Sequence, residues 1–309
     1  MEKIKLTFLG TASSIPTKKR NHTAMLVSYK SENILIDCGE GTQRQFKLAD
    51  ISPSKITRIL ITHWHGDHTL GLPGLLETLA MSDYSKSLYL YGPKGTSENL
   101  SLLNRLMKFY KKFQKYNLSV KEIFSGKVFE TPDFTITAEQ MSHGAPALAY
   151  SFQIKDKLRL NKEKLKKLKI TSSKDLKALS QGSSIKHNGK TVSASSVSYI
   201  EKGRKITFIL DTLPNKNAIK LSKNSDLLIC ESSFSESESQ IASKYKHLTT
   251  KQAAQIAKSS SSKALILTHI SQRYDSSISE IEKQAKSVFP NTKIANDLDV
   301  IELWATKLI

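Results

Sequence analysis

Residues 59–68 read Ile59-Leu60-Ile61-Thr62-His63-Trp64-His65-Gly66-Asp67-His68. An apolar run of strand character leads into four side chains that can bind metal, and a Gly-rich stretch follows at residues 70–74. Side chains alternate faces along a strand, so His63 and His65 are expected to point the same way. Asp67 and His68 then lie where the chain turns and can reach a second ion. The alternative is a His-rich surface loop.

Single His or Asp residues recur at the ends of other predicted strands. His143 follows the strand predicted over residues 134–139, Asp211 follows 206–210, and His269 follows 263–268. Loops after strands are where such folds place their chemistry. One such residue alone is more often structural. Three of them, together with the His and Asp side chains of residues 63–68 (the His block), argue against a surface loop.

The chemistry of these side chains indicates a hydrolytic metal centre. Imidazole and carboxylate ligands without thiolate favour zinc, with manganese or iron as further options. Seven ligands suit two ions about 3.5–4 Å apart that share a carboxylate and keep a position open. Such a pair lowers the pKa of a bound water to roughly 7 and stabilises negative charge on a phosphoryl or acyl oxygen.

Composition limits the class of protein. The 309 residues are 39% hydrophobic, which suits one large domain or two small ones and argues against global disorder. No apolar run approaches the roughly 20 residues of a bilayer span, and the N-terminus lacks a signal-peptide pattern. The two cysteines, Cys38 and Cys230, each beside an acidic residue, are expected to be buried reduced thiols. We therefore expect a cytoplasmic protein.

The formal charge of +19 favours a polyanionic partner such as nucleic acid. The alternative is a Lys-rich genome composition. The charge is uneven, because residues 155–177 hold ten Lys or Arg and three acids. We interpret residues 155–200 as a protruding basic insertion with little core of its own. A disordered basic linker between two domains is the alternative.

The apolar patterns predict a mixed succession of strands and helices without an internal repeat. Helical spacing is present at residues 96–116, 249–260 and 277–288, and in the first of these Leu102, Leu103, Leu106, Phe109, Tyr110 and Phe113 would share one apolar face. Strands are predicted over residues 4–9, 24–29, 34–37, 58–62, 88–91, 128–139, 149–154, 205–210, 226–230, 263–268 and 299–303.

With these residues in place, the His block resembles motif II of the metallo-β-lactamase superfamily, and nearly the whole chain resembles short-form ribonuclease Z (tRNase Z). The other matching stretches, in order, are Leu9-Gly10-Thr11, residues 16–21 (Pro-x-Lys-x-Arg-Asn), residues 37–43, Ser142-His143-Gly144, Asp211-Thr212 and residues 268–274. The resemblance implies an α/β fold, the αββα sandwich of two packed mixed β-sheets flanked by helices. Residues 1–309 would form a single domain, with residues 155–200 as an inserted, protruding arm that binds tRNA.

The resemblance also implies roles for single residues. Two Zn²⁺ per subunit would be bound, although Mn²⁺ or another divalent ion is an option. One ion would take His63, His65 and His143, the other Asp67, His68 and His269, and Asp211 would bridge them. Asp67 would also orient or deprotonate the attacking water.

A general acid is implied by the same resemblance. His247, paired with Glu231, would protonate the leaving oxygen, a step worth about 10²–10⁴-fold in rate. The carboxylate would keep the imidazole protonated and aimed. The alternative for His247 is a solvated residue in a Lys-rich loop. His22 and His187 are unassigned and expected on the surface or behind the ligands.

The implied function is that of a zinc-dependent endoribonuclease which removes the 3′ trailer from precursor tRNA. Cleavage would follow the discriminator nucleotide and leave a 3′-hydroxyl on the tRNA. The family resemblance further implies a homodimer in which the arm of one subunit serves the active site of the other. Substrate contacts are expected from Lys18, Arg20 and Asn21 near the acceptor end, and from arm residues such as Lys164, Lys166 and Lys167 at phosphates.

The chain departs from the family pattern at three places, and two other functions stay open. Leu210 stands where Gly is usual, Cys230 replaces the His of a His-Glu-Ala-Thr run, and the arm lacks a Gly-Pro motif, so its tip is expected to differ. A small-molecule phosphodiesterase on the same scaffold would need neither the arm nor the 16–21 loop. A non-catalytic RNA-binding relative would be indicated by a lost ligand, yet all seven are present.

Overall fold

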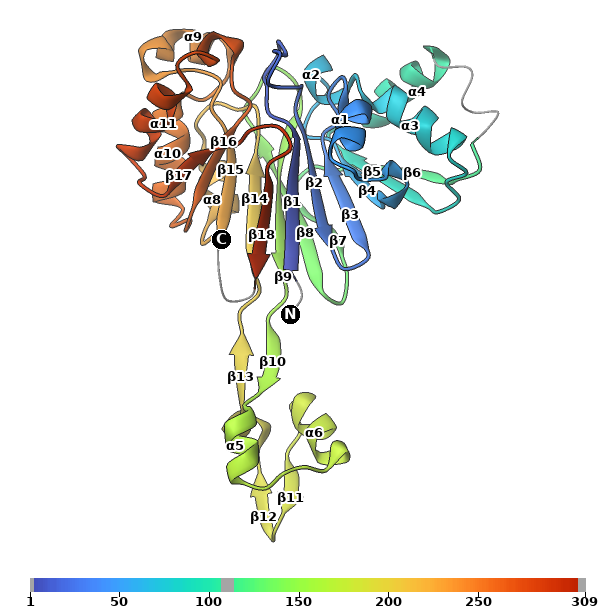
Figure 1. Ribbon diagram of the computed structural model, residues 1–309, viewed down its shortest axis with the longest axis vertical. Helices are drawn as coiled ribbons and strands as arrows, with labels where there is room; N and C mark the ends of the chain where they lie inside the picture. Colours follow the sequence, from blue (N-terminus) through green and yellow to red (C-terminus); the bar gives the residue numbers. More distant parts are fainter. Residues whose placement is uncertain (1–2, 107–113, 305–309) are drawn as a thin grey trace.

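The computed structural model describes residues 3–106 and 114–304, which form two seven-stranded sheets packed face to face with helices outside (Figure 1). The first sheet has the order β18-β1-β2-β3-β4-β5-β6 and the second β17-β16-β15-β14-β9-β8-β7. Each sheet is antiparallel at one side and parallel at the other, as at the β2–β3 and β3–β4 pairs. The expected αββα sandwich of two mixed sheets is therefore confirmed.

The strands of the first sheet are β1 (Lys3–Gly10), β2 (Ala24–Tyr29), β3 (Glu32–Ile36), β4 (Arg58–Leu60), β5 (Leu88–Gly92), β6 (Leu118–Glu122) and β18 (Val300–Trp304). Those of the second are β7 (Gly126–Glu130), β8 (Phe134–Met141), β9 (Ala147–Ile154), β14 (Lys205–Ile209), β15 (Leu227–Glu231), β16 (Leu265–Thr268) and β17 (Thr292–Ile294). The segment 128–139, for which strand character is predicted, forms a hairpin of β7 and β8, because the Thr131 hydroxyl accepts hydrogen bonds from the amides of Asp133 and Phe134 and forms a turn.

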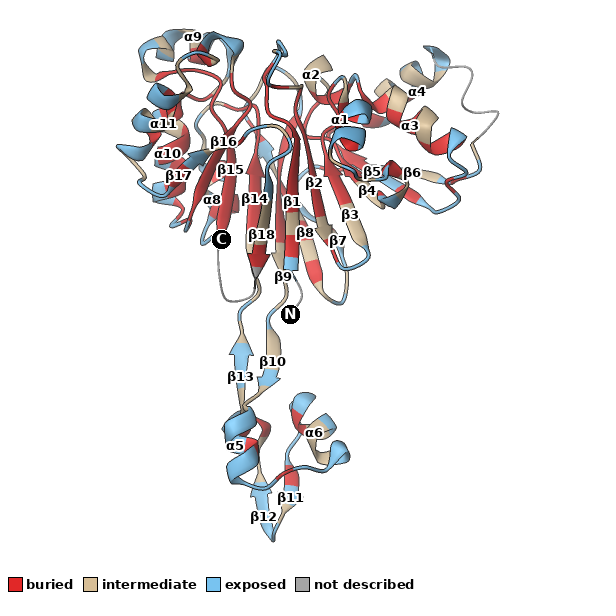
Figure 2. Ribbon diagram, viewed as in Figure 1, coloured by how far each residue is buried: buried red, intermediate tan, exposed pale blue. Residues whose placement is uncertain are grey.

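Both faces of the sheets are buried, which explains the nearly continuous apolar runs in the sequence. On β3, Ile34 and Ile36 face the partner sheet, whereas Leu35 between them packs under the outer helices. Each fully buried side chain of this size contributes about 1.5–3 kcal/mol. Figure 2 shows buried residues along both sheets. The outer helices are α1 (Thr42–Leu48), α3 (Leu72–Met81) and α4 (Thr96–Leu106) on the first sheet, and α8 (Lys216–Ser222), α10 (Thr250–Ser259) and α11 (Ile278–Lys286) on the second.

The predicted apolar face of the helix at 96–116 is wrong for Leu102 and Leu106, which are 53% and 79% exposed. Leu103 does pack against the core, on the side of the helix where Thr96 and Leu100 are buried. The spacing alone could not reveal which side of α4 meets the sheet. Phe109, Tyr110 and Phe113 lie outside the described residues.

Residues 155–200 form an arm that projects from one end of the sandwich (Figure 1). Its stem is β10 (Lys157–Leu160) paired with β13 (Ser198–Glu201). The expectation of little core is wrong, because Leu165, Ile170, Leu179, Ile185, Ala194 and Val197 pack into a core of the arm's own. The alternative of a disordered linker therefore does not hold, because residues 155–200 form a folded unit. This unit also contains α5 (Lys162–Lys167), α6 (Ser173–Ser180), α7 (Ala194–Val197) and the hairpin of β11 (Ile185–His187) with β12 (Lys190–Val192).

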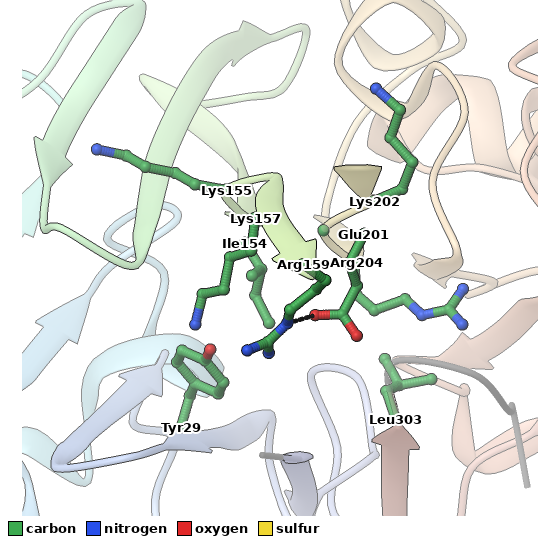
Figure 3. Close-up of a pocket in the computed structure, with 10 residues that line it drawn as sticks. Tyr29, Ile154, Lys155, Lys157, Arg159, Glu201, Lys202, Arg204 and Leu303 are labelled. Carbon is green, nitrogen blue, oxygen red and sulfur yellow. Dashed lines mark hydrogen bonds and ion pairs between the residues drawn. The ribbon is translucent and has the colours of Figure 1, made fainter. Parts of the chain in front are cut away.

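A small pocket of about 40 Å³ lies at the neck where the arm leaves the sandwich (Figure 3). It gathers five cationic side chains, but each has a carboxylate partner, as in the ion pair of Arg159 with Glu201 at 2.8 Å. The other pairs are Lys155–Glu130, Lys157–Asp133, Lys202–Asp156 and Arg204–Asp226. Three of these carboxylates also pair with a further lysine, Glu130 with Lys127, Asp133 with Lys30 and Asp226 with Lys263, so we interpret this neck as an ion-paired structural joint. No helix among the described residues is long and apolar enough to cross a membrane.

Candidate metal centre

The seven predicted ligands meet at the end of the sandwich opposite the arm, where several strands end (Figure 1). His63 and His65 lie in the loop after β4, and Asp67 and His68 lie in the short helix α2 (Gly66–Thr69). His143, Asp211 and His269 follow β8, β14 and β16. Residues spread over 207 positions (269 − 63 + 1) therefore contribute to one cluster.

Close backbone contact holds the His block against the loop that follows β3. Gly71 N donates to Cys38 O at 2.9 Å, and a Cβ on Gly71 would lie 2.0 Å from Gly39 O. A Cβ on Gly39 would in turn lie 2.4 Å from Asp67 O. The glycines at these positions let α2 approach, and so place Asp67 and His68 near the other ligands.

The first group of ligand atoms contains His63, His65, His143 and one oxygen of Asp211. Asp211 Oδ2 lies 3.5 Å from His63 Nε2 and 3.7 Å from His143 Nε2. His143 Nε2 lies 3.2 Å from His65 Nδ1. With metal–nitrogen bonds of about 2.0–2.1 Å, two ligands of a tetrahedral ion are about 3.3–3.4 Å apart. These spacings suit one ion.

The second group uses the other oxygen of Asp211. Asp211 Oδ1 lies 3.4 Å from His68 Nε2 and 3.2 Å from His269 Nε2, and these two nitrogens are 3.2 Å apart. Asp67 Oδ2 lies 3.5 Å from His68 Nε2 and 3.3 Å from His269 Nε2. Asp211 therefore faces both groups, one oxygen to each, as a bridging carboxylate does.

The unsatisfied atoms of the cluster fit divalent metal. His63 Nε2 and Asp211 Oδ1 are buried and have no hydrogen-bond partner, which is costly unless an ion binds them. In His68, His143 and His269, Nδ1 is engaged by an outer partner and Nε2 points inward. His68 Nδ1 contacts Asp37 Oδ2 at 2.6 Å, His143 Nδ1 contacts Lys246 O at 3.0 Å, and His269 Nδ1 contacts Ser233 Oγ at 2.8 Å. Such outer partners orient ligating imidazoles.

The electrostatics favour the ligand forms of three side chains. Burial by itself raises the pKa of Asp211, but His269, His68 and His63 outweigh burial and hold that pKa well below its usual value. Burial lowers the pKa of His63 well below its usual value. Burial also lowers the pKa of His143. An ionised carboxylate and neutral imidazoles are the forms that bind metal, and His68 is the exception, because Asp211 and Asp37 outweigh burial and hold its pKa well above its usual value.

His247 and Glu231 lie beside the second group. Glu231 ends β15 and is fully buried, and its Oε2 lies 3.0 Å from His247 Nδ1. Burial alone lowers the pKa of His247, but the Glu231 carboxylate and its hydrogen bond raise it to about 9. The ring stacks 5.5 Å from that of His269. The solvated-loop alternative for His247 does not fit this half-buried position.

Three supporting residues were missed from the sequence. Asp37 is fully buried, accepts from Thr62 N and Thr62 Oγ1 at 2.7 Å each, and holds His68. Thr62 Oγ1 also contacts His63 Nδ1 at 3.1 Å. Ser233 Oγ donates to Glu231 Oε2 at 2.7 Å and contacts His269. The signal for Asp37 was its place directly after a strand, two residues before Gly39. Nothing distinguished Thr62 or Ser233 from other hydroxyl residues.

The predicted substrate residues lie in different environments. Lys18 is exposed in the loop, and Lys164, Lys166 and Lys167 are exposed on α5. Arg20 is buried instead, and its guanidinium donates to Thr11 Oγ1 at 2.7 Å, to Ala295 O at 2.5 Å and to Asn296 Oδ1 at 3.0 Å. Asn21 N donates to Asp297 Oδ2 at 2.6 Å. These bonds make Arg20 and Asn21 internal supports of the loop.

The two unassigned histidines are separate from the metal groups. His22 is buried, not on the surface, and its Nε2 contacts Ser14 O at 3.2 Å under the 13–21 loop. His187 lies in the arm and contacts Leu168 O at 3.0 Å. Cys38 and Cys230 are buried free thiols, as expected.

A cleft of about 330 Å³ opens beside the cluster. His65, His143 and His247 border one side, and Ser13, Ser14 and Ile15 of the loop border another. Its remaining lining comes from Ser233, Phe234, Tyr245, Ser271, Gln272 and Arg273. The ligand atoms of His65 and His143 thus face a space that a substrate can enter.

Comparison with known proteins agrees with this geometry. The family model described as "Anti-Pycsar protein Apyc1" matches residues 4–175, a span that includes five of the seven ligands and ends before Asp211 and His269. Curated relatives named ribonuclease Z match almost the whole chain. That of Nanoarchaeum equitans is 39% identical over 95% of this chain and 92% of its own length. That of Methanothermobacter thermautotrophicus is 38% identical over 98% and 97%.

Solved structures show the same architecture. Human tRNase Z, short form, superposes with a TM-score of 0.69 at 25% identity, covering 96% of this chain and 98% of the other. The metallo-β-lactamase fold protein YhfI from Bacillus subtilis gives a TM-score of 0.71 at 19% identity, covering 98% and 100%, and supports the fold alone. Because the whole-chain relatives also span Asp211 and His269, they decide the assignment: the chain belongs to the ribonuclease Z family, on the metallo-β-lactamase fold.

Proposed function

We propose that this protein is a zinc-dependent endoribonuclease that removes the 3′ trailer from precursor tRNA. Cleavage follows the discriminator nucleotide and leaves its 3′-hydroxyl. The observation that carries the proposal is the position of Asp211 between two ligand groups, with the His247–Glu231 pair beside them. The membership in the ribonuclease Z family supplies the substrate class.

The metal ions would be held by the two groups that share Asp211. We assign His63, His65 and His143 to one ion, and Asp67, His68 and His269 to the other. Two Zn²⁺ ions would supply an acidified water and would stabilise negative charge on the phosphate, although Mn²⁺ also suits N and O ligands. Protein side chains would orient the water and transfer the proton.

The reaction forms a bond from water oxygen to phosphorus and breaks the bond from phosphorus to the 3′-oxygen of the discriminator nucleotide. Asp67 lies at the edge of the second group and accepts a hydrogen bond from the water, which orients it. His269 and His68 help to keep the pKa of Asp67 low against the opposing effect of burial, so its carboxylate is ionised. His247 gives its proton to the departing 3′-oxygen, and Glu231 holds that proton in place until transfer.

The basic arm provides a reason for the excess of cations. Lys164, Lys166 and Lys167 lie on an exposed helix of the arm and would contact tRNA phosphates. Lys18 is exposed on the loop beside the cleft and would contact the acceptor end. A small-molecule phosphodiesterase would leave the arm without a role, and a non-catalytic relative would leave His63 Nε2 and Asp211 Oδ1 buried without a partner.

We also propose a cytoplasmic homodimer in which each arm serves the partner's active site. In Figure 1 the arm leaves the end of the sandwich opposite α2, which carries Asp67 and His68, and this separation supports the arrangement. Co-expression of an arm-deleted chain with an Asp67→Ala chain tests this arrangement. Trailer removal by the mixture, when neither chain alone is active, is the expected result. A mixture no better than its parts would contradict it.

The function itself is tested with a precursor tRNA that carries a 3′ trailer. The expected product is a tRNA that ends in a 3′-hydroxyl at the discriminator nucleotide, together with a trailer that bears a 5′-phosphate. Asp67→Ala should abolish cleavage and largely keep tRNA binding. Hydrolysis of bis(p-nitrophenyl) phosphate without any trailer removal would instead support the small-molecule alternative.

A further inference from the structure

Two aromatic rings, those of Phe234 and Tyr245, border the cleft next to the metal ligands. The ring planes differ by 8° and their centroids are 6.5 Å apart. The Phe234 ring lies 5.9 Å from that of His247, which in turn lies 5.2 Å from that of His143. We call Phe234 and Tyr245 the aromatic shelf.

The shelf is open to the cleft and flanked by cations. Tyr245 is 56% exposed although it is a large ring, whereas Phe234 beneath it is buried. The Arg273 guanidinium, which also pairs with Glu238 at 3.1 Å, lies 5.5 Å from the centroid of Phe234, and Lys244 Nζ lies 5.7 Å from that of Tyr245. Both shelf residues and Arg273 line the same 330 Å³ cleft as His143 and His247, a volume near the lower end of the range of about 300–1,000 Å³ for small-molecule sites.

The backbone fixes the shelf relative to the catalytic groups. Tyr245 is the last residue of α9 (Ser239–Tyr245), and Lys246 after it adopts the left-handed region with φ 60°. That conformation directs Lys246 O to His143 Nδ1 at 3.0 Å and brings His247 beside Glu231. Phe234 directly follows Ser233, which contacts His269. The two rings are therefore built into the segments that hold the site.

This arrangement matches what single-stranded nucleic acid requires. Parallel or exposed aromatic rings stack on nucleobases, and nearby Arg and Lys side chains attract the adjoining phosphates. Stacking accepts all four bases, because every base has a π-face. A shelf of this type can bind a nucleotide whose base differs between tRNAs.

The position of the shelf indicates which nucleotide it takes. His247 protonates the 3′-oxygen that leaves, and that oxygen belongs to the discriminator nucleotide. Water attacks from the opposite side of the phosphate, so the neighbourhood of His247 is the discriminator side. We propose that Phe234 and Tyr245 form a subsite that stacks the base of the discriminator nucleotide. This inference rests on the proposed function of the site.

The first test needs no catalysis. A precursor tRNA with 2-aminopurine as the discriminator base is bound to metal-free protein, and stacking is expected to quench its fluorescence. Tyr245→Leu should lose most of the quenching and Tyr245→Phe should keep it. Equal quenching by the wild-type protein and Tyr245→Leu would overturn the proposal. Because cleavage is not measured, this result does not depend on the reaction assigned to the site.

The second test compares two substrates in cleavage. Loss of one stacking contact should lower kcat/KM of Tyr245→Leu about tenfold on a normal precursor. On a precursor with an abasic discriminator nucleotide, the same variant should equal the wild type. A similar loss on both substrates, or on neither, would overturn the subsite. If the wild-type protein cleaves neither precursor, the proposed function fails instead, whatever the shelf binds.

A matched control is available on the other side of the molecule. Tyr89 on β5 is 37% exposed and lies 4.9 Å from the Arg58 guanidinium, so it too is an exposed ring beside a cation. Tyr89→Leu should change neither quenching nor kcat/KM. Thermal unfolding of both Leu variants checks that each is folded.

Discussion

Glu231 and His247 form an ion pair of 3.0 Å at the edge of the ligand cluster, with the carboxylate fully buried and the imidazole half-buried. The pair joins the end of β15 to the segment after α9. Because Glu231 raises the pKa of His247 to about 9 against the effect of burial, the imidazole carries its proton at neutral pH. A protonated imidazole beside two ligand groups has the state that a general acid requires.

Replacing Glu231 with Gln is expected to slow trailer removal by about 10²–10⁴-fold. The neutral amide no longer holds the proton on His247, so the leaving 3′-oxygen departs without its acid. Hydrolysis of bis(p-nitrophenyl) phosphate should change little, because nitrophenolate leaves without protonation. Equal losses on the two substrates, measured with bound metal verified, would remove the pair from proton transfer.

Asp37→Asn is expected to weaken metal binding about 10–100-fold, because Asp37 is the carboxylate that orients His68. Asn tolerates the left-handed backbone that Asp37 adopts at φ 56°, so the loop should persist. Competition with a chromogenic chelator measures the affinity. An unchanged affinity would show that His68 needs no such partner.

The seven residues that meet at the candidate metal centre could be predicted from the sequence, because the spacing of the His block and the strand-end positions of His143, Asp211 and His269 carry the information locally. The supports of the site could not. Asp37 meets His68 only after β3 and β4 pair, and Lys246 supports His143 with a backbone carbonyl, which any residue has. The buried face of α4 depends on how the helix meets the sheet, which its own spacing does not encode.

The 16–21 loop gives a pair of opposite predictions. Arg20→Met should destabilise the fold by about 1–3 kcal/mol, because its guanidinium serves three buried or partly buried acceptors. Lys18→Met should leave the melting temperature unchanged. It should reduce the slope of log K for tRNA binding against log salt concentration by about one. Thermal unfolding and binding at several salt concentrations distinguish them. An Arg20 variant with normal stability and a reduced salt slope would contradict this assignment.

Deleting the arm should weaken tRNA binding without changing the hydrolysis of a small phosphodiester. Lys157 and Glu201 pair across the stem, so residues 158–200 can be replaced by a two-residue Gly-containing turn. The shortened protein should bind precursor tRNA more weakly and with a smaller salt slope, because many phosphate contacts are lost. Its hydrolysis of bis(p-nitrophenyl) phosphate should equal that of the intact protein. A comparable loss on the small substrate would show that the arm supports the fold or the centre.

If two ions that share Asp211 are needed to cleave precursor tRNA, protein stripped of metal should regain activity as metal is added back. Zinc is added to metal-free protein in known ratios, and trailer removal is measured at each ratio. We expect no cleavage without metal, a rise that levels off at two zinc ions per chain, and failure of Asp211→Asn to reach that plateau. Full trailer removal by the metal-free protein, or a plateau at one ion that Asp211→Asn also reaches, would contradict this expectation.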